Sequence, residues 1–324
     1  MAETIDSIVG QVFKNLSETD AGRERVCHMD DLVQLLNGAA EMLRQKRPRL
    51  PARPGMSFSV NTTQAQGETL KISVRVQGVD CGFVTFEKAG RMFGPCRNFK
   101  KQWSSLRKIS DQKALEWGEP AVAEYIRACG CAARARKYGR RESSIQELLF
   151  GALNEGGTKK TLRGFRPVLF SGVPIQIPLP VTPRGKSEEL GKHKGHSDVL
   201  ARSRSHGRLV VFEVKRPGAG RKECSGALGQ AVRYAAALDY LMSREEHRAA
   251  YWQLFGSRRG KDHVPRFSAV AFLDVEGGAS EEDLTAEIKE LLLNNSKGYD
   301  LIVMLYRRVS NGIEVVRTIC GKTQ

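Results

Sequence analysis

The stretch GHSDVLARSRSHGRLVVFEVKRPG, residues 195–218, predicts how the C-terminal part of this 324-residue chain folds. Residues 210–215 are predicted to form a strand, because they are mostly apolar and β-branched and end shortly before Pro217. Side chains alternate between the two faces of a strand. The two predicted faces are Val210, Phe212 and Val214 on one side, and Val211, Glu213 and Lys215 on the other.

Three charged side chains are expected to meet where this strand ends. Asp198 begins the preceding strand, and residues 203–207 are predicted to form the hairpin turn that brings Asp198 beside Glu213. Lys215 lies one two-residue step from Glu213, about 6.6 Å along the strand. Mg²⁺ accepts one or two protein carboxylates and keeps its other positions for water and phosphate, and a nearby lysine can position or deprotonate the attacking water. The pattern therefore indicates phosphodiester hydrolysis, although Glu-x-Lys alone is also typical of an exposed ion pair.

With these residues the sequence resembles the PD-(D/E)XK nuclease superfamily, over about residues 140–320. Ser197-Asp198 matches the first half of the motif, with Ser197 in place of the proline, and Glu213-Val214-Lys215 matches the second half. The resemblance implies that Asp198 and Glu213 bind Mg²⁺, for which Mn²⁺ can substitute, and that Lys215 activates water.

A second element follows in the run GQAVRY, which places Gln230 and Tyr234 four residues apart on one helix face. This spacing resembles the Gln-x-x-x-Tyr element of the RecB-like branch, which lies near the active site and the DNA strand. The resemblance implies that Gln230 and Tyr234 lie near the substrate, and we expect these two residues and Arg216 to position it. The alternative is an ordinary half-buried helix face.

The family also carries a glutamate on the helix before the sheet, and residues 140–157 offer three candidates. Glu142 ranks first, as an accessory metal ligand, because it opens a Glu-Ser-x-x-Gln run. Glu147 ranks second as a catalytic residue, with a capping box to Ser144 as its alternative. Glu155 ranks third because it precedes two glycines.

The order of predicted elements after residue 142 is helix, several strands, helix, strand, helix and strand, which is typical of an α/β or α+β core. The resemblance implies a restriction-endonuclease-like core, a central mixed sheet flanked by helices, in residues 136–324. Residues 1–135 are predicted to be a basic N-terminal α+β extension that binds nucleic acid or a partner. Within it we expect two helices before residue 47, the second capped by Asp30 or Asp31, and an antiparallel sheet in residues 56–88.

Charge favours a polyanionic partner. The chain has 52 Lys and Arg against 36 Asp and Glu, a net charge of +16, and a pI near 9.7. Basic side chains are concentrated in residues 97–141 and 184–194, which are predicted to contact phosphates, with a solvated helix face as the alternative.

The lengths of the apolar runs and the distribution of cysteines indicate where in the cell the protein is expected to be. The longest apolar runs are too short to cross a bilayer, so no membrane partner is expected, and no secretion signal precedes them. The seven cysteines are scattered and are expected to be thiols in an intracellular protein.

The predicted function is a Mg²⁺-dependent deoxyribonuclease. Two alternatives stay open: a nuclease-fold protein that binds nucleic acid without cleaving it, and an RNA-directed nuclease, since charge does not distinguish DNA from RNA.

We expect DNA binding in EDTA to weaken steeply as salt rises, because lysines and arginines displace condensed counterions. Neutralising Lys100, Lys101, Arg107 and Lys108 together should flatten the dependence of log K on log salt by about 4 × 0.9 units if all four touch phosphate. Fluorescence anisotropy at several salt concentrations measures the slope. An unchanged slope would make this stretch a solvated face.

Overall fold

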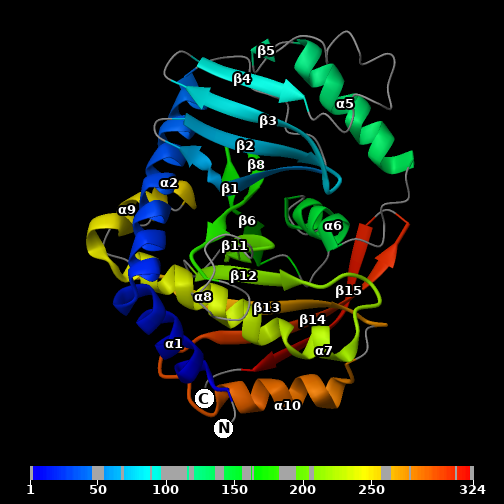
Figure 1. The fold of residues 1–324 in the computed structure, drawn as a ribbon. Helices are drawn as coiled ribbons and strands as arrows, with labels where there is room; N and C mark the ends of the chain where they lie inside the picture. Colours follow the sequence, from blue (N-terminus) through cyan, green and yellow to red (C-terminus); the bar gives the residue numbers. More distant parts are fainter. Residues whose placement is uncertain are drawn as a thin grey trace.

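The computed structural model describes residues 3–45, 55–66, 69–87, 90–95, 115–116, 120–135, 142–154, 162, 164–181, 195–203, 208–256, 264–276, 279–310 and 312–321. Within these ranges no helix is long and apolar enough to cross a membrane. The chain builds two large sheets with helices around them, so the predicted mixed α/β (α+β) class is confirmed (Figure 1).

The central sheet has six strands in the order β15-β14-β13-β12-β11-β6. The strands β12, β13 and β14 run parallel, whereas β6, β11 and β15 are antiparallel to their neighbours, so the sheet is mixed. The strand bounds are β6 (Phe165–Pro167), β11 (Val199–Ser203), β12 (Arg208–Val214), β13 (Arg266–Asp274), β14 (Asp300–Val309) and β15 (Gly312–Gly321).

Helices cover both faces of the central sheet. The helix α6 (Glu142–Asn154) packs on the face that carries Val210, Phe212 and Val214, and α8 (Ala227–Ser243) packs on the other face. The predicted alternation along β12 is therefore confirmed, and Glu213 emerges on the α8 side. Because both faces are covered, β12 is apolar at nearly every position.

Helical connections link the parallel strands, as parallel pairing requires. The chain leaves β12 through α7 (Arg221–Ser225), α8 and α9 (Glu245–Leu254) before it enters β13, and α10 (Glu281–Leu292) leads to β14. The long helix expected over about residues 225–243 is confirmed as α8, which begins at Ala227, and the short helix α7 precedes it. The helix α9 was not predicted.

The second sheet has seven strands in the order β5-β4-β3-β2-β1-β8-β7. This sheet contains strands from both predicted regions of the chain, residues 1–135 and 136–324. The strand β1 belongs to the first region and pairs in parallel with β8, which belongs to the second. The strands are β1 (Met56–Gln66), β2 (Thr69–Val76), β3 (Val79–Glu87), β4 (Gly90–Pro95), β5 (Leu115–Glu116), β7 (Leu169–Phe170) and β8 (Val173–Gln176). A further pair consists of β9 (Pro178–Leu179) and β10 (Gly195–His196).

The N-terminal helices also pack on the C-terminal half. The helix α1 (Ile5–Glu18) lies against α8, and α2 (Asp20–Gln45) lies against α9, whereas α5 (Pro120–Ala135) packs on β2 and β3. One apolar core runs continuously from α1 to β14. Residues 1–135 are therefore an integral part of the fold, and they supply strands β1 to β5 of the second sheet.

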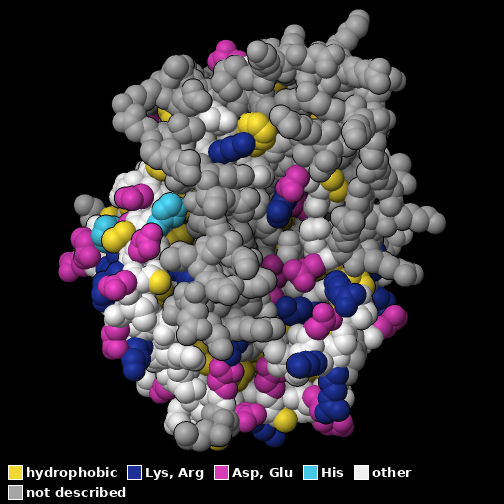
Figure 2. Space-filling view, in the orientation of Figure 1, with side chains coloured by type: hydrophobic (Ala, Val, Ile, Leu, Met, Phe, Trp, Pro, Cys, Tyr) yellow, Lys and Arg dark blue, Asp and Glu magenta, His cyan; other side chains and the backbone are white. Residues whose placement is uncertain are grey.

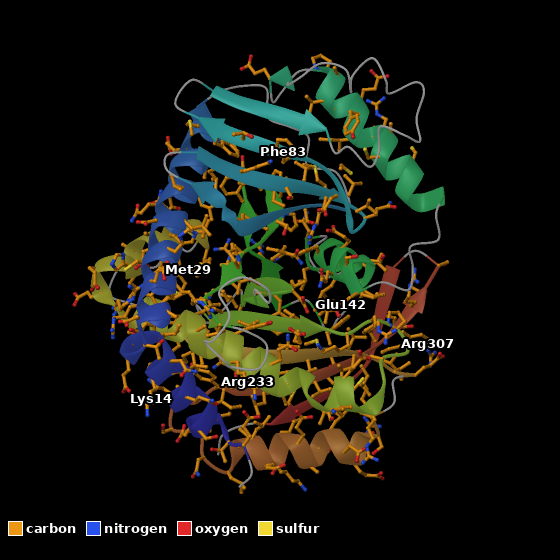
Figure 3. All side chains as sticks on the ribbon, viewed as in Figure 1. Lys14, Met29, Phe83, Glu142, Arg233 and Arg307 are labelled. Carbon is orange, nitrogen blue, oxygen red and sulfur yellow. The ribbon has the colours of Figure 1, made fainter. Side chains whose placement is uncertain are left out.

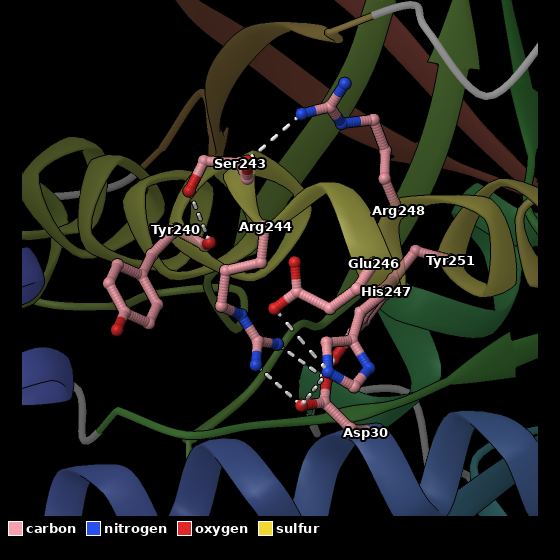
Figure 4. A network of polar contacts seen from close by, with 8 residues as sticks. All are labelled: Asp30, Tyr240, Ser243, Arg244, Glu246, His247, Arg248 and Tyr251. Carbon is pink, nitrogen blue, oxygen red and sulfur yellow. Dashed lines mark hydrogen bonds and ion pairs between the residues drawn. The ribbon is translucent and has the colours of Figure 1, made fainter.

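A buried ion pair joins α2 to α9 (Figure 4). The carboxylate of Asp30 accepts hydrogen bonds from both terminal nitrogens of Arg244, each at 2.6 Å, and from the Tyr251 hydroxyl at 3.1 Å. Since α2 begins at Asp20, Asp30 lies in the middle of the helix, and its predicted role as a helix cap is wrong. The residue instead fixes how α2 docks.

We expect Arg244→Met to lower the free energy of unfolding by about 3 kcal/mol, because it leaves the buried Asp30 carboxylate without its cation. Urea denaturation measures this change. The control is Arg317→Met, which removes the exposed Arg317–Glu281 pair and should cost less than about 1 kcal/mol. Equal losses in the two variants would contradict a docking role for Arg244.

Candidate active site

Asp198 lies just before β11, one residue beyond the pair Val199–Phe212, and is therefore next to Glu213 across the two strands. Its side chain is buried and both of its oxygens are hydrogen-bonded. The main-chain N–H of Val214 donates to Oδ2 at 2.7 Å, and the side-chain amide of Gln146 donates to Oδ1 at 2.8 Å. The antiparallel pairing of β11 with β12 thus brings the two carboxylates together, and two donors hold Asp198 in one orientation; most of the predicted turn, residues 204–207, lies outside the described residues.

Lys215 links Glu213 to the Gln230–Tyr234 pair. Its Nζ donates to Glu213 Oε1 at 2.6 Å and to Gln230 Oε1 at 3.2 Å, and Gln230 Nε2 donates to the Tyr234 hydroxyl at 2.9 Å. The backbone of Lys215 is fixed as well, since its N–H donates to the Phe272 carbonyl. The spacing of Gln230 and Tyr234 on α8 therefore places both beside Lys215.

Glu142 is the first residue of α6 (Figure 3), and its charge acts on Asp198 and Glu213. Burial raises the pKa of Glu142. The positive charges of Lys215 and Arg216 oppose this shift, whereas the negative charge of Glu223 adds to it. Its carboxylate also lies 3.4 Å from the Gln146 amide. Glu142 therefore adds a third carboxylate to Asp198 and Glu213.

The carboxyl groups perturb one another. Burial, and then the charges of Glu213 and Glu142, raise the pKa of Asp198 well above its usual range, against the effect of the Val214 N–H and Lys215. Burial likewise raises the pKa of Glu213 to about 7, although Lys215 opposes this. For Lys215, burial lowers the pKa, but the three carboxylates outweigh burial and the pKa is raised. Such mutually perturbed groups are concentrated at functional sites in proteins.

Arg216 lies at the exposed edge of the cluster. Its guanidinium is 3.3 Å from the carboxylate of Glu223 on α7, and both side chains are about half exposed. Figure 2 shows acidic and basic side chains next to one another on this face of the molecule, and Arg221 of α7 pairs with Asp283 of α10 at 2.6 Å. Arg216 thus has the exposure and charge to meet a phosphate from solvent.

Glu147 lies away from the cluster. It is buried between α6 and β1, where it accepts a hydrogen bond from the Ser57 hydroxyl. The alternative capping box with Ser144 is wrong, because α6 begins at Glu142 and Ser144 is already inside the helix. Burial raises the pKa of Glu147 to about 8, against the effect of Ser57 and Arg75.

Two buried glutamines in the site were not predicted to have a role. Gln146 on α6 contacts Asp198 directly, and Gln176 on β8 donates to the Gln146 side chain at 2.8 Å and to the Asp198 carbonyl at 2.7 Å. The sequence could have indicated Gln146, because this residue ends the Glu-Ser-x-x-Gln run. No sequence motif indicates Gln176, because its role depends on the pairing of β8 with β1.

The donor set suits a hard divalent cation. Asp198, Glu213 and Glu142 supply carboxylate oxygens only, and Glu213 Oε2 is buried with no hydrogen-bond partner in the described part of the chain. Across these same ranges, no three His, Cys, Asp or Glu side chains are already arranged around one point as a metal site. Because Mg²⁺ is usually bound through one or two protein carboxylates, with water in its other positions, two of these three side chains would suffice to hold it.

Several residues predicted to act in the site or to contact phosphate lie outside the described residues: Glu155, the stretch 184–194, and most of 97–141, including Lys100, Lys101, Arg107 and Lys108.

Comparison of the chain with protein-family models, with curated proteins and with solved structures finds no match.

We expect stability to fall as pH rises from about 4.5 to 8, in part because of Glu147. Its pKa is raised in the folded state, so between the unfolded value near 4.3 and the folded value of about 8 the folded protein holds a proton that the unfolded chain releases. Glu147→Gln keeps an acceptor for Ser57 and should be more stable than wild type at pH 8, by about 1 kcal/mol or more, with little difference at pH 4.

Urea denaturation of wild type and variant at pH 4, 6 and 8 measures the difference. Glu18→Gln, at an exposed position of α1, is the control and should leave the pH dependence unchanged. A Glu147→Gln variant with the same pH dependence as wild type would contradict the assignment.

Proposed function

We propose that the protein is a metal-dependent nuclease that hydrolyses DNA phosphodiester bonds on a restriction-endonuclease-like fold. The observation that carries the proposal is the meeting of Asp198, Glu213 and Lys215 at the end of β12, with Gln230 and Tyr234 beside them. Residues far apart in the sequence converge there, and the same residues carry the resemblance to PD-(D/E)XK nucleases.

The order of elements supports the same proposal. The helix α6 precedes the antiparallel strands β6, β11 and β12, and α8 then leads to the parallel strand β13. This order gives a mixed sheet flanked by helices, as the resemblance implies. It also places Glu142 on the helix before the sheet, where the family carries a glutamate.

In this proposal Asp198 and Glu213 hold Mg²⁺ or Mn²⁺, with Glu142 as an accessory ligand. The ion supplies a more acidic bound water and neutralises charge on the scissile phosphate. Asp198 is suited to its part because the Val214 N–H and Gln146 fix the plane of its carboxylate. The net positive charge of the chain favours a polyanionic substrate.

Lys215 contributes a positioned cation. Glu213 and Gln230 orient its ammonium group, and the surrounding carboxylates keep it protonated. A protonated lysine donates hydrogen bonds to the attacking water or to the phosphoryl oxygens, whose negative charge grows in the transition state. Tyr234 accepts from the Gln230 amide and so directs the Gln230 carbonyl toward Lys215. Arg216, at the exposed edge, is placed to contact the adjacent phosphate.

We expect Asp198→Asn, Glu213→Gln and Lys215→Met each to lower the cleavage rate by about 10³-fold or more, because each removes a charge that acts on the reacting groups. These replacements keep the shape of each side chain, which matters because truncation of Asp198 would leave two buried donors unpaired. The measurement is cleavage of plasmid, linear DNA and RNA, each with Mg²⁺, with Mn²⁺ and with EDTA.

The matched control is Lys222→Met, which removes an exposed lysine on α7 and should cleave like wild type. Melting temperatures of all variants identify loss of fold. Wild-type protein that binds DNA but cleaves nothing would overturn the nuclease proposal in favour of a binding protein, and cleavage of RNA alone would overturn the choice of substrate.

A further inference from the structure

We propose that Arg75, on β2 in the N-terminal half, is a positioning residue of the candidate active site that acts on Asp198 through Gln176 and Gln146. The inference rests on the proposed function, and it adds a part for residues 1–135 that their charge does not reveal. Arg75 and Asp198 are 123 positions apart in the sequence.

Three consecutive hydrogen bonds connect Arg75 to Asp198. The Arg75 Nη1 donates to Gln176 Oε1 at 2.5 Å, Gln176 Nε2 donates to Gln146 Oε1 at 2.8 Å, and Gln146 Nε2 donates to Asp198 Oδ1 at 2.8 Å. We call these four side chains the amide relay. Both glutamines are buried, with exposed fractions of 4% and 6%, so water cannot readily replace the protein groups along the relay.

The direction of the amide relay follows from the chemistry of arginine. A guanidinium has only donors, so the group of Gln176 that faces Arg75 must be its carbonyl oxygen. The NH₂ group of Gln176 then faces Gln146, whose carbonyl must accept, and the NH₂ group of Gln146 is turned toward Asp198. Arg75 thus fixes the amide directions together with two acceptors, the Asp198 carbonyl on Gln176 and the Glu142 carboxylate on Gln146.

Asp198 depends on this choice. A reversed Gln146 would present its carbonyl oxygen to the Asp198 carboxylate, and two acceptors would face each other in a buried site. In the observed direction the carboxylate receives one donor on each oxygen, Gln146 on Oδ1 and Val214 on Oδ2. Two donors fix the carboxylate plane, as supporting partners do for metal ligands in general.

Sheet pairing brings the amide relay to the site. Ser57 of β1 lies opposite Arg75 of β2, and Ser59 of β1 lies opposite Gln176 of β8. The two strands that carry Arg75 and Gln176 are thus held on either side of β1. Gln176 also donates to the Asp198 carbonyl at 2.7 Å, so β8 holds the backbone of Asp198 as well as its side chain.

The test compares Arg75→Met with Arg75→Lys. Methionine has no donor, whereas lysine, like arginine, has only donors, so only methionine leaves the buried Gln176 carbonyl without its donor. We expect Arg75→Met to lower kcat for DNA cleavage by about 10- to 100-fold with KM within about 3-fold of wild type, as for other residues that support a ligand. Arg75→Lys should restore most of kcat.

Two further variants separate this effect from loss of fold. Gln176→Glu still accepts from Arg75 but, when ionised, cannot donate to Gln146, so it should lower kcat to a similar extent. Asp80→Asn removes the exposed Arg75–Asp80 pair at 2.9 Å without touching the relay and should leave kcat unchanged. Melting temperatures accompany each measurement.

A spectroscopic readout is independent of cleavage. In protein with ¹⁵N-labelled glutamine side chains, Arg75→Met should shift the NH₂ signals of both Gln146 and Gln176, whereas Asp80→Asn should shift neither. Unchanged kcat in Arg75→Met, or an equal loss in Arg75→Lys, would overturn the positioning role and leave the nuclease proposal standing. If the wild type cleaves no nucleic acid but Arg75→Met still shifts both amide signals, the nuclease proposal is overturned and the relay is supported.

Discussion

Burial of several carboxylates at the end of β12 is the constraint on which the site and its surroundings depend. Asp198 and Glu213 are almost fully shielded from water, and Glu142 acts on both. Buried acidic groups are costly unless donors or cations compensate them. The surrounding elements supply these donors and cations. The strand β12 provides the Val214 N–H and leads into Lys215, and the helix α6 provides the Gln146 amide.

This compensation explains why the two halves of the chain are joined. Gln146 holds Asp198 at the end of a relay that runs back through Gln176 to Arg75, and both of these residues belong to the seven-stranded sheet. The Asp30–Arg244 pair then fixes α2 on α9 at another point of the same interface. The N-terminal half thus supports the candidate active site as well as carrying much of the basic charge.

Much of the site could be predicted from local pattern. The alternation along β12 correctly placed Glu213 and Lys215 on one face, and the four-residue spacing of Gln230 and Tyr234 placed them on one side of α8. The two helix glutamates show where local pattern fails. Glu142 and Glu147 both lie on α6, yet only Glu142 faces the cluster, because Glu147 points toward Ser57 of β1.

The sequence by itself determined the elements whose cause is local: the apolar strand that ends in Glu-x-Lys, the hairpin that brings Asp198 beside it, and the helix that follows. Periodicity and turn chemistry act over a few residues, so they are visible in the sequence. Only the tertiary structure decided that β1 pairs with β8, that Asp30 binds Arg244, and that Arg75 reaches Asp198 through two glutamines. These contacts depend on pairing and packing between distant segments, and no local spacing of residues encodes which segments will meet.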